Sequence, residues 1–503
     1  MTVLCDGVEY ENDYTQYKPG VDRKLVVDDI ISSLNIKGIR QNDGAKLLWY
    51  DGGVFRDKPD TRIKGKVLEL LKDNYKINEV RELLSRLSAD DRVLVDEYAF
   101  DNDIDKICLM NGTYSIKERV MLETTPEQLN SIRLPVWYDA NAKCDPIVEL
   151  ISRLLENEDN IKTMQEFFGF CLLRDYKYKH MFILLGPRDT GKTTIMNVLM
   201  NMLGTTHTPE GTENVSNVLM HDLCGENPFH RVKLYKKLLN YGDDLPEKAI
   251  EDTSLIKAIT GRGWIDAERK HLDSIRFMSF AKQAYSCNAF PYVKGDKESF
   301  LGRVILLMCE HILSSSEMIP HIESTLYGKD NMSGLFNWSL EGLYRLLENN
   351  HFTSSKRSEE MKNLCLRKME PIRGFIEDCI ILDVDGKIRM PEMYEAYKMW
   401  CEEAGVVVLD NKKFYPRFEA KIPSLRRGKH RFNRGPSEVC FCGVRLKSEY
   451  DIGYQNELVG PKAIAQKDEH DRGVFDFEHP HQNDDVAGYE EVYEKSDEDW
   501  ADQ

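Results

Sequence analysis

The chain has 503 residues, of which 41% are apolar and 30% are charged, an ordinary balance for a water-soluble fold. This length exceeds what one hydrophobic core can serve, so two to four domains are expected. The longest apolar runs, Met181–Leu185 and Val304–Cys309, are far shorter than the roughly 18 residues that span a bilayer. The acidic N-terminus lacks a signal-peptide core, and the 12 cysteines are scattered. These features argue against a membrane or secreted protein and predict a cytoplasmic one.

The formal net charge of −17 is distributed unevenly along the chain. Residues 448–503 carry a net charge of −13, whereas residues 411–447 carry +9. The overall acidity therefore does not exclude a nucleic-acid partner. The local charges predict a basic module followed by an acidic tail. The tail has few aliphatic residues and is expected to be disordered. Masking of a nucleic-acid surface, recruitment of a partner and plain solubilisation all remain open for it.

The apolar periodicity divides the chain into units. Hairpin patterns at 46–57 and 106–116 flank a helical pattern at 64–87, which predicts an α+β domain first. Strand and helix patterns then alternate, as in a three-layer α/β domain. The predicted units are an N-terminal α+β domain (1–140), an α/β domain (141–355, with its core at 178–312 and a helical part at 313–355), a C-terminal domain (356–448) and the acidic tail (449–503).

Residues 186–194, GPRDTGKTT, match the phosphate-binding pattern G-x-x-x-x-G-K-[ST] between an apolar strand and a helical pattern. The two glycines let the backbone approach an anion closely, and the loop N–H groups and the helix N-terminus face it. Lys192 is expected to reach the outer phosphates of ATP, and Thr193 to ligate Mg²⁺. The predicted ATP-binding residues are Gly186, Pro187, Arg188, Asp189, Thr190, Gly191, Lys192, Thr193 and Thr194.

Polar residues follow two further apolar strands. Asp243 and Asp244 supply the carboxylate that a P-loop ATPase needs to hold Mg²⁺ and polarise water, although Asp is also common at a helix start. The sequence does not decide which of the two ligates the metal. Asn288 would lie beside the γ-phosphate and orient the attacking water, with a simple turn before Pro291 as the alternative.

Arg303 directly precedes another apolar strand. The planar, permanently charged guanidinium is suited to the phosphate charge of a transition state. If Arg303 acts from a neighbouring subunit, the active site exists only in an oligomer. An exposed arginine at a strand edge is the alternative.

Two basic segments are candidates for nucleic-acid binding. Arg269, Lys270 and His271 lie between two strand-like stretches, so they form either a basic tip that holds backbone phosphates or a solvated turn. Residues 390–447 suit a winged helix, with two helices before a basic hairpin. Phe432 is interleaved among the cations, where core packing is favoured over base stacking. The predicted wing cations are Arg426, Arg427, Lys429, Arg431 and Arg434.

This run of motifs resembles the superfamily 3 helicases. More narrowly, it is similar to the primase–helicase family of phages, plasmids and large DNA viruses, whose poxvirus member is a nucleoside triphosphatase. Two departures stand out: Thr190 replaces the usual Asn before the Gly-Lys pair, and no acid follows Thr260–Gly261. The resemblance covers roughly residues 100–447 and is carried by NGTYSI (111–116), 133–151, 166–194, 255–291, 333–347 and 441–447.

The resemblance implies a ring-forming AAA+ motor, usually hexameric, that uses ATP and Mg²⁺ to move on single-stranded DNA. It also implies that residues 313–355 form a helical lid and that ERKH (268–271) is a DNA-gripping hairpin. The family's functional residues carry over to Lys192 and Thr193 for ATP and Mg²⁺, Asp243 and Asp244 for the acidic pair, Asn288 for the water-orienting sensor and Arg303 for the finger acting in trans.

The leading hypothesis is therefore an ATP-dependent replicative DNA helicase of a phage, virus or mobile element. It would act as a homo-oligomeric ring on single-stranded and forked duplex DNA. About 140 residues precede the ATPase, without clustered carboxylates, so a separate primase or polymerase is the expected partner. The alternatives are a P-loop ATPase that serves as a DNA-binding switch or scaffold, and a non-catalytic replication-initiation protein, against which the intact catalytic set argues.

Overall fold

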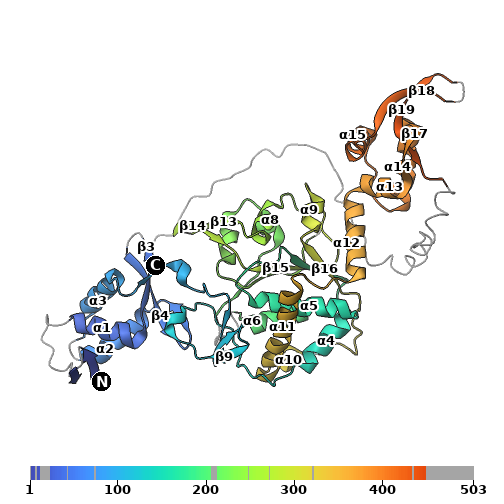
Figure 1. Ribbon diagram of the computed structural model, residues 1–503. Coiled ribbons are helices and arrows are strands. Elements are labelled where there is room, and N and C mark those ends of the chain that lie inside the picture. Colours follow the sequence, from blue (N-terminus) through green and yellow to red (C-terminus); the bar gives the residue numbers. More distant parts are fainter. Residues whose placement is uncertain are drawn as a thin grey trace, which may run out of the picture.

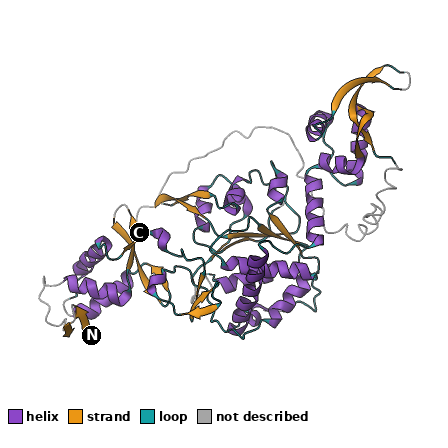
Figure 2. Cartoon of the chain, viewed as in Figure 1, coloured by secondary structure: helices purple, strands orange, loops and turns teal. Residues whose placement is uncertain are grey.

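The structure is a computed structural model that combines helices with several small sheets and one parallel sheet (Figures 1 and 2). The N-terminal elements lie at one end, the parallel sheet in the middle and the C-terminal elements at the other end (Figure 1). Among the described helices, none combines the length and apolar character of a membrane span. The acidic tail predicted at 449–503 lies outside the described residues. Those residues are 2–5, 8–11, 23–41, 44–72, 75–205, 212–246, 248–270, 272–319, 322–432 and 435–448.

Residues 23–95 form a four-stranded sheet of order β5-β4-β3-β6, covered by three helices. The hairpin predicted at 46–57 is confirmed as β4 and β5, and Gly52 and Gly53 take positive φ angles of 51° and 114° in its turn. The elements are β1 (Thr2–Cys5), β2 (Val8–Glu11), α1 (Arg23–Leu34), β3 (Lys37–Gln41), β4 (Gly44–Asp51), β5 (Val54–Asp57), α2 (Asp60–Leu71), α3 (Ile77–Ala89) and β6 (Leu94–Val95).

The hairpin predicted at 106–116 is also present, but it packs on the central part of the chain. The ring of Tyr114 lies 5.8 Å from that of Phe336, and its hydroxyl is 2.9 Å from that of Tyr344. The expected boundary at residue 140 therefore falls inside a continuous core. A three-stranded sheet this small needs such a neighbour to bury its apolar face. The elements are η3 (Glu97–Ala99), β7 (Lys106–Leu109), β8 (Gly112–Ser115), β9 (Val120–Leu122) and η4 (Pro126–Gln128).

The central sheet has five strands, all parallel, in the order β11-β12-β15-β10-β16. Because parallel strands share a direction, their carboxyl ends meet at one edge of the sheet. The strand of the phosphate-binding motif, β10, is separated by β15 alone from β12, which precedes the acidic pair. The strands are β10 (Met181–Leu185), β11 (Val215–Ser216), β12 (Leu239–Gly242), β15 (Lys282–Cys287) and β16 (Val304–Met308).

Helices cover both faces of this sheet, as successive residues of β10 demonstrate. Phe182 and Leu184 belong to a hydrophobic cluster with α4, α5, α6 and α11, whereas Met181, Ile183 and Leu185 belong to another with α7, α8, α9 and α12. The sheet therefore lies between two helical layers. The helices are α4 (Asp145–Leu155), α5 (Glu158–Leu172), α6 (Lys192–Leu203), α7 (Met220–Cys224), η5 (Pro228–Leu234), α8 (Ser254–Thr260), α9 (Lys297–Leu301), α10 (Ile322–Leu326), α11 (Lys329–Asn349) and α12 (Lys356–Met369).

The long helix α11 packs directly along α5. A Cβ added to Gly169 would lie 2.4 Å from the carbonyl oxygen of Ser339, and one added to Gly342 would lie 2.2 Å from that of Gln165. The buried carboxylate of Glu166 accepts hydrogen bonds from Arg345 Nε and from the backbone N–H of Thr353, each at 2.7 Å. Helix α11, which falls in the stretch expected to be a lid, is thus part of the central core.

Helix α12 also belongs to the central domain, although the C-terminal domain was expected to begin at residue 356. Met361, Cys365 and Met369 of this helix pack in the cluster that includes β16 and α9. The C-terminal part therefore begins near Pro371. It has its own core of aromatic side chains, including Phe375, Tyr397 and Phe414. Its elements are α13 (Pro371–Cys379), β17 (Ile380–Arg389), α14 (Met390–Glu403), α15 (Asn411–Lys421), β18 (Arg426–Arg431) and β19 (Ser437–Leu446), with the strand order β17-β19-β18.

The glycine contact between α5 and α11 predicts opposite effects for two Gly→Ala substitutions. Gly342→Ala should lower the free energy of unfolding by about 3 kcal/mol, because the methyl group would push the two helix backbones apart. Gly65→Ala in α2 should raise it by about 1 kcal/mol, because no atom lies within 4 Å of the added Cβ. Urea unfolding followed by circular dichroism measures both. Equal effects of the two substitutions would contradict the packing.

Candidate nucleotide site and nucleic-acid surfaces

The phosphate-binding loop lies between β10 and α6, where the sequence pattern predicts it. A Cβ added to Gly186 would lie 1.9 Å from the carbonyl oxygen of Cys309, so only glycine fits this crossing of two chain segments. Gly191, the residue before α6, has a φ of +86°, which glycine adopts without strain. The loop therefore delivers its N–H groups and the start of a 12-residue helix to one place.

Lys192 is 8% exposed and folds back over the loop. Its ammonium group donates to the carbonyl oxygens of Gly186, at 2.7 Å, and Pro187, and to the hydroxyl of Thr190 at 3.2 Å. Burial lowers its pKa from the ordinary lysine value. These partners are neutral oxygens, so this buried positive charge fits an anionic ligand.

Asp243 lies against the loop, although 50 residues separate it from Thr193. The Thr193 hydroxyl donates to Asp243 Oδ2 at 2.9 Å. Partial burial raises the pKa of Asp243, but hydrogen bonds from Ser286, Tyr241 and Thr193 outweigh this and leave the pKa below its usual value. The carboxylate is therefore held ionised. A hydroxyl beside an ionised carboxylate is an oxygen donor set of the kind that Mg²⁺ prefers.

Asp244 is placed differently from Asp243. Both are exposed, but the φ of Asp244 is +52°, and its backbone N–H donates to Asp243 Oδ1 at 3.0 Å and to Ser286 Oγ at 3.1 Å. Of the acidic pair, Asp243 alone contacts Thr193 within the described hydrogen bonds. The geometry thus separates the two aspartates, which the sequence does not.

Tyr241 and Ser286 are site residues that the sequence analysis misses. The Tyr241 hydroxyl donates to Asp243 Oδ1 at 2.8 Å and lies 3.1 Å from Ser286 Oγ, which itself donates to the same carboxylate oxygen. Each lies two residues before a predicted site residue, Asp243 or Asn288. This period-2 spacing on a strand is the signal that could have found them.

Asn288 lies at the carboxyl ends of the parallel strands, whereas Arg303 lies at their amino ends. Asn288 directly follows β15, and the preceding carbonyl, of Cys287, accepts a hydrogen bond from Gly186 N at 3.2 Å. Arg303 directly precedes β16, whose first residue, Val304, pairs with Met181, the first residue of β10. The structure therefore brings Asn288 next to the phosphate-binding loop and keeps Arg303 away from it. Arg303 Nε has no hydrogen-bond partner among the described residues.

The basic tip predicted near residue 270 lies at the end of a hairpin of two antiparallel strands, β13 (Trp264–Arg269) and β14 (Leu272–Met278). Lys270 is exposed, whereas the guanidinium of Arg269 lies 5.4 Å from the centre of the Tyr235 ring. His271 lies outside the described residues. Lys270 is thus open to solvent, whereas Arg269 is held against the Tyr235 ring.

In the C-terminal part, the predicted wing cations lie on the edge strand β18. Arg426, Lys429 and Arg431 are exposed, and Arg427 is exposed but forms an ion pair with Glu419. Arg434 lies outside the described residues. The neighbouring helix α15 adds three exposed cations that the sequence analysis did not single out, Lys412, Lys413 and Arg417.

Phe432 does not enter the core, contrary to the favoured expectation. It is half-buried, it is not part of the C-terminal hydrophobic cluster, and Arg389 lies 4.4 Å from its ring centre. The cause is its position just beyond the end of β18, where the chain has left the sheet. The ring of His430 lies 5.0 Å from that of Phe432, nearly perpendicular to it.

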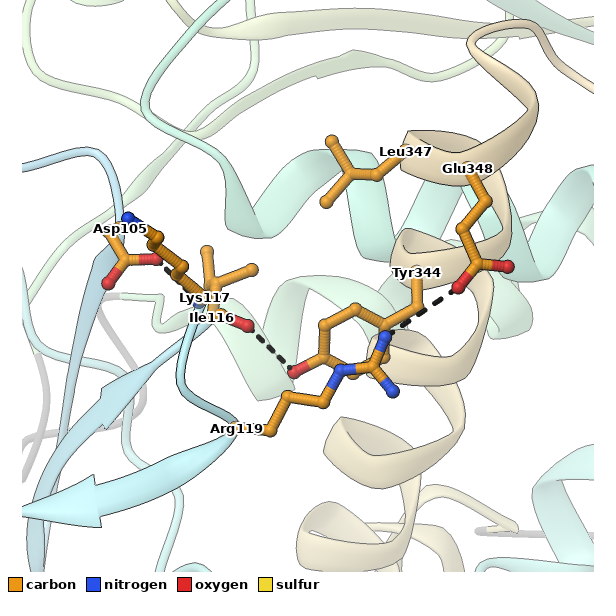
Figure 3. A pocket seen from close by; sticks show the side chains of 7 residues that line it. All are labelled: Asp105, Ile116, Lys117, Arg119, Tyr344, Leu347 and Glu348. Carbon is orange, nitrogen blue, oxygen red and sulfur yellow. Dashed lines mark hydrogen bonds and ion pairs between the residues drawn. The ribbon is translucent and has the colours of Figure 1, made fainter.

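A separate cavity of about 370 Å³ lies beside α11, away from the phosphate-binding loop (Figure 3). The guanidinium of Arg119 lies 3.9 Å from the centre of the Tyr344 ring and 3.6 Å from Glu348. These contacts join the small sheet of residues 106–122 to α11 and account for the charged side chains there. The lining residues are Asp105, Ile116, Lys117, Arg119, Tyr344, Leu347 and Glu348.

Comparison with known proteins relates two segments to described families. Residues 184–303 match a family of unknown function (DUF5906), and residues 367–439 match the family described as poxvirus D5 protein-like. Neither match spans half of the chain. No curated protein matches it.

Among solved structures, the chain is similar to the C-terminal region of NrS-1 in its apo forms. One is 13% identical with a TM-score of 0.46 over 84% of this chain and 100% of that chain. Another is 12% identical with a TM-score of 0.47 over 85% and 100%. With scores this low, the function has to be argued from the site.

The unequal placement of the two aspartates predicts unequal effects on Mg²⁺-dependent binding. Asp243→Asn should weaken the binding of a fluorescent ATP analogue with Mg²⁺ by about tenfold or more, because a carboxylate beside Thr193 is lost. Asp244→Asn is the matched control and should change affinity by less than about twofold. Titrations with Mg²⁺ and with EDTA separate the metal contribution. A larger loss in the Asp244 variant would contradict the assignment.

Proposed function

We propose that this chain is an ATP-dependent DNA helicase of the AAA+ class, related to the superfamily 3 helicases of phage, plasmid and large-DNA-virus replication. The observation that carries the proposal is the 2.9 Å hydrogen bond between Thr193 and Asp243. It brings a phosphate-binding motif and an acidic strand end together at one edge of a parallel sheet, which is the arrangement that phosphoryl transfer from ATP requires. The match of residues 367–439 to poxvirus D5-like proteins supports the same class.

The roles of the residues follow from their chemistry. The loop N–H groups and Lys192 would hold the phosphates, since the ammonium group can leave its carbonyl partners for an anion. Thr193 and Asp243 would hold Mg²⁺, which supplies charge neutralisation to the β- and γ-phosphates. Tyr241 and Ser286 orient the Asp243 carboxylate. Asn288 would orient the attacking water from the end of β15.

The position of Arg303 supports a ring. A five-residue strand spans about 16 Å, so Arg303 at the start of β16 lies far from the phosphate-binding loop of its own chain. Its side chain is half-buried, so part of the side chain is exposed at this end of the sheet. In a head-to-tail ring, this edge would face the loop of the next subunit and supply the transition-state cation in trans. A hexamer is the expected closed form.

DNA would be held by two separate surfaces. The exposed Lys270 at the tip of the β13–β14 hairpin would contact backbone phosphates inside the ring. The C-terminal part would act as a winged helix, with the cations of β18 and α15 on phosphates and Phe432 available to stack on a base. A separate primase or polymerase would supply primer synthesis.

The proposal predicts ATP hydrolysis that single-stranded DNA stimulates and that rises steeply with protein concentration. Arg303→Ala should lower turnover by about 1,000-fold, the usual magnitude for such a finger, and Lys192→Ala should abolish it. Arg153→Ala, which removes an exposed arginine of α4, is the control and should retain activity. Turnover that is linear in protein and indifferent to DNA and to Arg303 would favour a switch ATPase instead.

The basic edge strand predicts a salt-dependent contribution to DNA binding. The triple substitution of Arg426, Lys429 and Arg431 by Ala should reduce the slope of log affinity against log salt by about two for single-stranded DNA, because each phosphate contact contributes about 0.7. The matched control is the triple substitution of Lys64, Lys72 and Lys76 by Ala, which removes the same exposed charge from the N-terminal part. Equal slopes for the two variants would contradict a specific role of β18.

A further inference from the structure

The segment that follows β16 contacts the phosphate-binding loop at three points. The carbonyl of Cys309 lies against Gly186, where no side chain would fit. The backbone N–H of Leu313 donates to the carbonyl oxygen of Asp189 at 2.9 Å. The Leu313 side chain also packs over Gly191, at 3.7 Å from the position of an added Cβ. Residues 309–318, named here the strap, thus border the loop from its first glycine to its last.

The middle contact supports a strained part of the loop. Asp189 has a φ of +61°, in the left-handed region that a residue other than glycine rarely adopts, and such a conformation costs about 1–3 kcal/mol unless its surroundings hold it. The hydrogen bond from Leu313 is a described contact from outside the loop that fixes the Asp189 carbonyl. The orientation of the neighbouring N–H groups, which would face the phosphates, depends on the same peptide planes.

The strap is itself anchored through His311. One ring nitrogen, Nδ1, lies 3.2 Å from Glu156 at the end of α4, and the other, Nε2, lies 3.1 Å from Glu317. Each ring nitrogen thus faces a carboxylate, one at the end of α4 and one on the strap.

Glu317 also closes the strap on itself. Its carboxylate accepts from the hydroxyl of Ser314 at 2.6 Å and from the backbone N–H of Ser314 at 2.8 Å. These bonds, followed by that from His311, lower the pKa of Glu317 to about 2. Glu317 therefore stays ionised, and the turn that carries Leu313 is held from both sides. A second anchor at the start of the strap is the ion pair of Glu310 with Arg357 of α12, at 2.6 Å.

We propose that the strap positions the phosphate-binding loop for nucleotide and that His311 is its positioning residue, which ties the strap to α4 through Glu156 and closes it on itself through Glu317. The consequence for function rests on the ATPase proposed above, whereas the effect on the loop itself does not. His311 touches no reacting atom; it acts by holding Leu313 where its N–H reaches Asp189.

The test uses hydrogen–deuterium exchange of the full chain without nucleotide, together with steady-state ATP hydrolysis. In His311→Ala, the amides of residues 188–191 and 313 should exchange about tenfold faster than in the wild type. The KM for ATP should rise by about tenfold while kcat stays within about twofold, since loop positioning affects binding more than the chemical step. His311→Arg, whose guanidinium has N–H donors for both carboxylates, should restore both values.

Two further variants keep the result interpretable. Glu317→Gln should reproduce the faster exchange without removing the imidazole, and His351→Ala, which removes an exposed imidazole elsewhere, should change neither measurement. Unchanged exchange at 188–191 in His311→Ala, or an equal increase in His351→Ala, would overturn the proposal. Because exchange is measured without turnover, a wild type that fails to hydrolyse ATP would refute the proposed function and leave the strap to be judged on exchange alone.

Discussion

The hydrogen bond between Thr193 and Asp243 is the contact on which the rest of the site depends. It forms because β10 and β12 run parallel with only β15 between them, so the residues that follow each strand emerge at one edge. The helical layers on both faces bury these strands completely and hold their relative position. The Asp243 carboxylate and the Thr193 hydroxyl, 50 residues apart in sequence, are thereby held within hydrogen-bond distance of each other.

A second group of contacts fixes the Asp243 carboxylate and the phosphate-binding loop, which form the two sides of this site. On the acidic side, Tyr241 and Ser286 keep the Asp243 carboxylate oriented and ionised. On the loop side, the strap supports the left-handed backbone at Asp189. Lys192 lies between the two, buried and bonded to carbonyl oxygens that an anion can replace. The site therefore combines an ionised carboxylate, held by neutral donors, with a buried ammonium group that fits an anionic ligand.

Local patterns were enough to predict the parts of the fold that are local. The strand before Gly186, the helix after Gly191 and the hairpin turn at Gly52 and Gly53 all have signatures within a few residues of sequence, and each is confirmed. The pairing of Asp243 with the loop was expected from the general order of such sheets. The functional roles of Asn288, Arg303 and the basic residues stay predictions.

The domain boundaries, the packing of α11 and the partners of Asp243 depend on contacts between distant segments, so local sequence patterns do not predict them. The small sheet of residues 106–122 and the helix α12 pack on the central core, which shifts both domain boundaries. Helix α11 looks like a separate amphipathic helix until Gly169 and Gly342 are seen to bring it onto α5. Tyr241 and Ser286 resemble ordinary strand residues, because only their spacing of two residues from Asp243 and Asn288 indicates that they share a face with these residues.

We propose above that ATP is hydrolysed at the Thr193–Asp243 site and that Arg303 of a neighbouring subunit completes this site. Mixing two inactive variants, Lys192→Ala and Arg303→Ala, tests it most directly. In a shared site, a subunit with an intact loop can receive Arg303 from a neighbour that lacks only Lys192. We expect mixtures to hydrolyse ATP faster than either variant alone, with a maximum near equal proportions. Mixtures that stay inactive at every ratio, while the wild type is active, would contradict a site shared between subunits.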